Sequence, residues 1–195
     1  MDVAALYVDV EAGPYAGMAG VDAWGVERDA KLYRGPHPVV AHPPCGPWGR
    51  LSALCTRQDP SCGPRAVEQV RAFGGVLEHP VHSRLWKVMN LPRPGEFSFD
   101  GLWTLELDQC RWGHRCRKRT WLLMSGVPRS AVGPLPPWQE PTHCIDDGAA
   151  RLGGRPSRWL KMPSGETHLT PPAFAEWLVA LARTAREPCA PQVVG

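Results

Sequence analysis

Cys45 is the side chain best suited to covalent chemistry in this sequence. It lies in Pro43-Pro44-Cys45-Gly46-Pro47, directly after the apolar run 38–41, which predicts a short buried strand. Prolines on both sides of the thiol leave the backbone few conformations, which suits a nucleophile that must be aimed at one atom. The alternative is an unreactive structural cysteine, because free cysteines are usually buried and inert.

Glu78 repeats this arrangement one strand later. Residues 75–80 predict a strand that is stopped by proline and presents Glu78 and His79 near its end. Reactive groups of open α/β sheets collect beyond the carboxyl ends of strands, so we expect Cys45 and Glu78 to converge. A thiol beside a carboxyl group suggests covalent catalysis. His42 or His79 could carry a proton there, and a surface or packing role is the alternative for both.

A cationic segment forms the third chemical feature. Five of the nine residues 111–119 are Lys or Arg. We expect guanidinium groups near Cys45 to favour its thiolate, and arginine is well shaped to hold a phosphate or a base edge. Trp48, close to the thiol, could stack on a base or on the sugar-phosphate path, with core packing as the alternative.

Alternating strands and helices must position these groups, which favours an α/β sheet. Apolar patterning predicts strands over residues 4–10, 23–27, 38–41, 75–80, 102–108 and 121–127, the last two as a possible hairpin. The same reasoning predicts helices over residues 64–73, 83–89 and 170–181. We expect the last helix to pack on the sheet, because its apolar residues form one stripe.

One domain is expected to cover residues 1–187, followed by a flexible tail at 188–195. Proline-rich residues 132–141 predict a linker, and residues 146–164 predict a mobile loop. The chain has 195 residues, 43% of them hydrophobic, and a net charge of +3, which describes a globular protein. No apolar run could span a membrane and no basic signal peptide begins the chain, so we expect a soluble, cytoplasmic protein without membrane partners.

The cysteine pattern argues against a disulfide framework and against a metal. Seven cysteines are odd in number and irregularly spaced, so reduced thiols are the simpler assumption. Zinc could use part of the set Cys110, His114, Cys116, His143 and Cys144. These spacings match no common zinc motif, so we expect no metal.

Three motifs together resemble those of the DNA cytosine-5 methyltransferases. Pro43-Pro44-Cys45, Glu78-His79-Pro80 and the basic run 115–121 are similar, in order, to that family's Pro-Cys nucleophile loop, its Glu-Asn-Val or Glu-Asn-Pro motif and its Gln-x-Arg-x-Arg motif. The resemblance covers residues 38–185 and is closest to short methyltransferase-like proteins of bacteriophages. In those proteins a Cys-x-Tyr-Gly segment precedes the basic run, much as residues 110–113 do here.

The resemblance implies a fold and a set of roles. The fold would be a truncated Rossmann-like, methyltransferase-like open sheet with flanking helices. Cys45 would add to C6 of a flipped pyrimidine, Glu78 would bond the N3 and exocyclic edge, and C5 would attack an electrophile. Arg117 and Arg119 would hold the catalytic loop and the nucleic-acid backbone. The implied partner is DNA, with contacts from Trp48, Arg115, Arg117, Lys118 and Arg119.

The first part of the chain departs from the family. There a Phe-x-Gly-x-Gly motif cradles S-adenosylmethionine after the first strand, whereas residues 11–17 here read Glu-Ala-Gly-Pro-Tyr-Ala-Gly. Glu27 could stand for the acidic residue that holds the cofactor ribose, with an ordinary solvated glutamate as the alternative. S-adenosylmethionine is thus a possible cofactor whose usual motif is missing.

Three functions stay open from the sequence. The first is methyl transfer to C5 of a pyrimidine in DNA through a Cys45 adduct. The second keeps the adduct but exchanges the substituent of a 5-substituted pyrimidine without S-adenosylmethionine, as a DNA hypermodification. The third is a catalytically inert DNA-binding or anti-restriction relic. If a phage encodes the protein, its expected place is the host-cell cytoplasm.

Overall fold

A six-stranded mixed sheet organises the chain. The computed structural model describes residues 2–50, 52–55, 58–96, 98–144, 159–163 and 165–186. The strand order is β2-β1-β3-β4-β6-β5, in which the first four strands are parallel and β6 runs antiparallel to both β4 and β5. The strands are β1 Val3–Leu6, β2 Val21–Trp24, β3 Val39–Ala41, β4 Gly75–Pro80, β5 Trp103–Asp108 and β6 Arg119–Ser125. A separate parallel pair joins β7 His143–Cys144 to β8 Leu160–Lys161.

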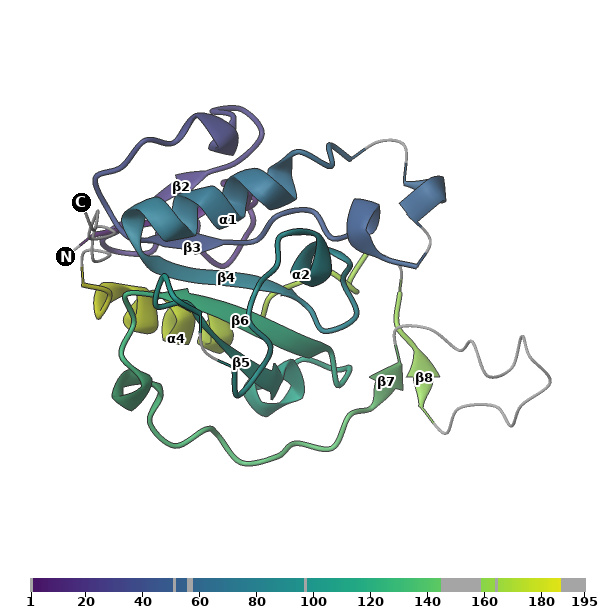
Figure 1. Ribbon diagram of the computed structural model, residues 1–195. Helices are drawn as coiled ribbons and strands as arrows, with labels where there is room; N and C mark the ends of the chain where they lie inside the picture. Colours follow the sequence, from purple (N-terminus) through teal and green to yellow (C-terminus); the bar gives the residue numbers. More distant parts are fainter. Residues whose placement is uncertain are drawn as a thin grey trace, which may run out of the picture.

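Helices cover the two faces of this sheet. α1 (Cys62–Phe73) packs against β3 and β4, and α4 (Pro172–Arg183) packs on the opposite face against β4, β3 and β1 (Figure 1). A short helix, α2 (Leu85–Val88), follows β4. The described 3-10 turns are η1 Ala30–Leu32, η2 Gly46–Trp48, η3 Ser52–Leu54, η4 Gln109–Trp112 and η5 Arg129–Val132.

The central strands are apolar on both faces because both faces are covered. Every residue of β1 and of β3 is fully buried. Val40 and Val76 face the cluster under α4, whereas their neighbours Val39 and Leu77 face the cluster under α1. This alternation explains why these strands read as continuous apolar runs in the sequence.

The structure confirms three predictions from the sequence: the α/β class, the hairpin of β5 and β6, and the packing of the last helix on the sheet. The first two strands are shorter than expected. β1 ends at Leu6 because Tyr7 takes a left-handed backbone conformation with φ 61°, and β2 ends at Trp24 instead of continuing to residue 27.

Two expected segments lie largely outside the described residues. Of the loop predicted over residues 146–164, the described part is residues 159–163, which contain β8. The tail predicted at 188–195 lies wholly outside. Among the helices of the described ranges, none is both long and apolar enough to cross a membrane.

Candidate active site

Cys45 and Glu78 lie at the same edge of the sheet, as the sequence predicts. β3 and β4 are parallel, with Ala41 opposite Leu77, so the chain that carries Cys45 leaves β3 beside Glu78. Cys45 is exposed and Glu78 is only 8% exposed. Although Cys45 is an exposed residue, neighbouring atoms shield its sulfur from part of the solvent; this shielding, followed by the negative charge of Glu78, raises the pKa of Cys45.

The cation that acts on this thiol is Lys118, whose positive charge opposes the rise in the pKa of Cys45. The expectation that guanidinium groups favour the thiolate is therefore wrong. The three arginines of the basic run bind carboxylates instead, at 2.6–2.9 Å: Arg115 with Glu166, Arg117 with Asp108, and Arg119 with Glu106.

Glu78 accepts three hydrogen bonds from buried or half-buried groups. His42 Nδ1 lies 3.1 Å from its Oε2, and Gln109 Nε2 and Thr120 Oγ1 donate to its Oε1 at 3.0 and 3.2 Å. Burial by itself raises the pKa of Glu78, but the His42 hydrogen bond and the positive charge of Lys118 outweigh it and hold that pKa at about 2. Glu78 is therefore an ionised acceptor at neutral pH.

Tyr15 extends this network by one member. Its hydroxyl lies 2.6 Å from His42 Nε2, and Tyr15 is 1% exposed. In the described part of the chain this is the one hydrogen bond of that hydroxyl, so the tautomer that satisfies both groups has Tyr15 donating to Nε2. His42 Nδ1 then carries the hydrogen and donates it to Glu78.

The sequence did not identify Tyr15, Gln109 or Thr120 as site residues. Tyr15 comes from the turns between β1 and β2 and carries no local signal. Thr120 pairs with Pro80 in the ladder between β4 and β6, and the alternation of side chains along these strands puts it on the same face as Glu78. Gln109 begins η4, and its position is set by the tertiary fold.

The other aromatic and imidazole candidates have packing roles. His79 is fully buried at a T-shaped angle to Trp86, and burial lowers its pKa to about 4. Trp48 is half-buried against the cluster under α1, and its carbonyl accepts the Arg84 amide at 2.9 Å. Both side chains thus contribute to packing, and Trp48 also anchors the loop that carries Cys45.

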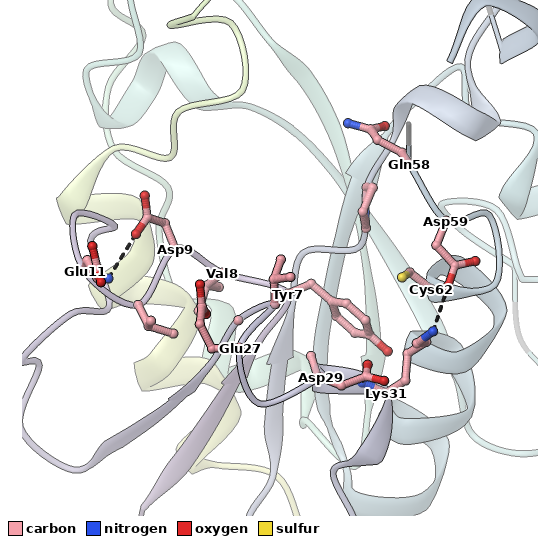
Figure 2. Close-up of a pocket in the computed structure, with 15 residues that line it drawn as sticks. Tyr7, Val8, Asp9, Glu11, Glu27, Asp29, Lys31, Gln58, Asp59 and Cys62 are labelled. Atoms are coloured by element: carbon pink, nitrogen blue, oxygen red, sulfur yellow. Dashed lines mark hydrogen bonds and ion pairs between the residues drawn. The ribbon is translucent and has the colours of Figure 1, made fainter. Parts of the chain in front are cut away.

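A pocket of about 910 Å³ opens beyond the carboxyl ends of β1 and β2. Its lining includes Pro44, so it reaches the loop that carries Cys45. Figure 2 shows Glu27 among the acidic side chains of its wall, although β2 has ended three residues before it. The acidic lining residues are Asp9, Glu11, Glu27, Asp29 and Asp59; Lys31, the one Lys or Arg among the lining residues, pairs with Asp59 at 2.7 Å.

The set weighed for zinc does not form a metal site. Across the part of the chain that the structure describes, no group of three or more His, Cys, Asp or Glu side chains is arranged to hold a metal ion. His114 Nδ1 instead lies 3.0 Å from the Cys116 backbone nitrogen and oxygen.

Comparison with known proteins gives no relative for this chain: no family model, no curated protein and no solved structure matches it.

Proposed function

We propose that this protein modifies C5 of a pyrimidine in DNA through a covalent bond between Cys45 and C6 of the base. The observation that carries the proposal is the placement of an exposed thiol and an ionised, hydrogen-bonded carboxylate at the carboxyl ends of the neighbouring parallel strands β3 and β4. Such a pair supplies a nucleophile and an acceptor for the edge of a base.

The sheet order supports the truncated Rossmann-like fold that the resemblance implies. β1 lies between β2 and β3, so the chain moves to one side of β1 and then crosses to the other. Ligands of open α/β sheets bind in the crevice at such a reversal, and the order 2-1-3-4 is one of the common doubly wound orders. The pocket lies at the carboxyl end of β1, as this rule expects.

Glu78 has room for one more donor. Its Oε1 accepts two hydrogen bonds and its Oε2 accepts one, whereas a carboxylate oxygen can accept two. The remaining position of Oε2 would take an N–H of the pyrimidine edge. Because Cys45 is exposed, a base that has left the helical stack can approach its sulfur.

The basic run supplies phosphate contacts in this proposal. The side chains of Arg115, Arg117 and Arg119 are 47%, 52% and 41% exposed, so each guanidinium can meet a phosphate while it stays near its carboxylate. Arg117 also lies 5.6 Å from the centre of the exposed Trp138 ring, which adds an aromatic surface beside the cations.

The acidic pocket fits S-adenosylmethionine in size and charge. A volume of about 910 Å³ is large enough for such a ligand, and a wall of carboxylates suits its positive charge. Glu27 would accept hydrogen bonds from the ribose hydroxyls. The cofactor, when bound, supplies the methyl group that C5 attacks.

Exchange of a 5-substituent is the second candidate, and the turn after β1 favours it. Asp9 Oδ1 closes that turn by accepting the Glu11 and Ala12 amides at 2.9 Å, in the place where the family uses glycines to approach the cofactor. An acidic pocket would equally attract an amine, which could serve as the incoming nucleophile.

A trapping experiment tests the proposal. The purified protein is mixed with DNA containing 5-fluorocytosine, with and without S-adenosylmethionine, and covalent complexes are measured on a denaturing gel and by intact mass. We expect an adduct on Cys45 that depends on the methyl donor, and none with Cys45→Ser. Measurable DNA binding without any adduct would instead favour the inert DNA-binding protein.

A further inference from the structure

We propose that Trp138, with Arg111 and Arg117 beside its ring, stacks on an unpaired base of the DNA strand that carries the target pyrimidine. This inference rests on the proposed function and names its substrate class, which is single-stranded DNA or DNA with unpaired bases next to the target. It goes beyond the phosphate contacts of the basic run, because it adds a site for a second base.

The Trp138 ring belongs to a segment that is fixed to the rest of the protein. The Arg111 guanidinium donates to the Pro136 carbonyl at 2.6 Å, and the Gln139 side chain donates to the Arg111 carbonyl at 3.2 Å. Leu135, earlier in the same segment, packs against the cluster under α4. Trp138 is nevertheless 43% exposed, so these contacts hold a large aromatic side chain in place while it stays open to solvent.

Two cations lie beside this ring without covering it. The guanidinium carbons of Arg111 and Arg117 are 5.8 and 5.6 Å from the ring centre. A guanidinium that stacks directly on an indole lies closer, as Arg28 does over Trp24 at 3.8 Å. The wider spacing at Trp138 leaves room at the ring and places positive charge close to it.

The charges around the ring suit a nucleotide. Glu140 accepts a hydrogen bond from the indole nitrogen at 3.2 Å, which places this carboxylate at the edge of the ring and not on a face. Arg117 is paired with Asp108, whereas none of the ion pairs between described residues includes Arg111. A guanidinium has five N–H groups, so Arg111 can bind a phosphate in addition to its present carbonyl partner. An aromatic ring for the base and a cation for the phosphate are the groups that bind single strands without sequence preference.

η4 joins this surface to the Glu78 site. Arg111 lies two residues after Gln109 in η4, and the Gln109 side chain donates to Glu78 Oε1 at 3.0 Å. A strand whose target base reaches Cys45 can therefore place a neighbouring base on Trp138.

Stacking on Trp138 requires a base with an uncovered face. Inside a duplex both faces of a base are covered by its neighbours, whereas single strands and unpaired bases offer theirs. Enzymes that modify a base either extrude it from a duplex or act on a single-stranded substrate. A surface that binds an unpaired neighbour of the target favours the second route.

Trp138→Leu tests the stacking contact, because it keeps an apolar side chain and removes the aromatic face. Affinity for single-stranded DNA should fall about 10-fold, as expected when one base loses its aromatic partner. Affinity for a fully paired duplex of the same sequence should hardly change, and Trp138→Phe should recover part of the lost affinity. The matched control is Phe99→Leu, which removes another exposed ring, outside the basic run, and should leave both affinities unchanged. Filter binding measures all four.

Photocross-linking locates the base. Single-stranded DNA in which 5-iodouracil replaces thymine is irradiated with Cys45→Ser protein, so that the thiol cannot react with the ring, and the cross-linked peptide is identified by mass. We expect the cross-link at Trp138. The wild-type protein should also form its 5-fluorocytosine adduct faster with single-stranded DNA than with duplex DNA.

The results separate this inference from the proposed function. If Trp138→Leu binds single strands as tightly as the wild type and no cross-link reaches Trp138, the stacking site is overturned even where the adduct forms, and the exposed ring is then a surface for a protein partner. Stacking at Trp138 without any adduct in the wild type would overturn the covalent step alone.

Discussion

The 2.6 Å hydrogen bond between the Tyr15 hydroxyl and His42 Nε2 determines how Glu78 can act. Tyr15 is buried and donates to His42, so His42 presents its Nδ1 hydrogen to Glu78. The carboxylate receives donors from two sides and stays an acceptor. A residue of the turns after β1 thereby controls the chemistry of a residue of β4, and each step of that control can be tested.

Tyr15→Phe removes the first donor without changing the shape of the core. We expect the adduct with 5-fluorocytosine DNA to form more slowly, because His42 no longer has a fixed tautomer, and a stability loss of about 1 kcal/mol from the lost hydrogen bond. Tyr33→Phe is the matched control, since it also removes a buried hydroxyl, one that donates to the His37 carbonyl at 2.9 Å. Equal adduct rates in the two variants would contradict the positioning role of Tyr15.

Cys45→Ser should abolish base modification while the unfolding midpoint in urea stays near that of the wild type. The reason is that the thiol is exposed and fills no part of the core. Turnover assays and urea unfolding on the same preparation check both parts. Retained turnover in this variant would remove Cys45 from the mechanism.

Glu78→Gln should slow modification much more than DNA binding. It should also lower the pH midpoint of Cys45 alkylation, because the negative charge that raises the pKa of the thiol is removed. A variant that no longer folds would identify Glu78 as a structural acid.

Stability should fall on acidification in two steps. The pKa of His79 is lowered from 6.5 to about 4, so between these values the unfolded chain takes up a proton that the folded chain does not. The pKa of Glu78 is lowered from 4.5 to about 2, so its contribution is complete above pH 4.5 and is lost as the pH falls toward 2. That contribution is on the order of 3 kcal/mol.

Urea unfolding at a series of pH values measures this loss. In Glu78→Gln the decline between pH 4.5 and 2 should be smaller, while the decline below pH 6.5 that belongs to His79 remains. If stability falls equally in the variant and the wild type between pH 4.5 and 2, Glu78 is not stabilised as an ion.

Arg117→Gln combined with Arg119→Gln should weaken DNA retention most at low salt. Each phosphate contact that is lost lowers the slope of log affinity against log salt by about 0.9. Arg71→Gln is the control, because Arg71 also belongs to an exposed ion pair, with Asp100 at 3.0 Å, outside the basic run. Filter binding across a salt series gives the slopes, and an unchanged slope in the double variant would exclude these arginines as phosphate contacts.

The amino-acid sequence by itself determined the α/β class and the convergence of Cys45 and Glu78 at one edge of the sheet. Strands with apolar residues on both faces must be buried, and prolines mark the chain ends of both strands: Cys45 follows the end of β3, and Glu78 lies near the end of β4. Parallel pairing then brings their ends together, which is why this convergence could be predicted without a structure.

Only the tertiary structure decided what surrounds that pair. Tyr15 and His42 are 27 residues apart, His42 and Glu78 are 36 apart, and Lys118 reaches a carbonyl 51 residues away. No local pattern records such contacts, because they depend on how separate elements pack. The expectation that arginines favour the Cys45 thiolate was wrong for the same reason. A run of cations is visible in the sequence, whereas the carboxylates that bind these arginines are brought near by the β5–β6 hairpin and by the chain before α4.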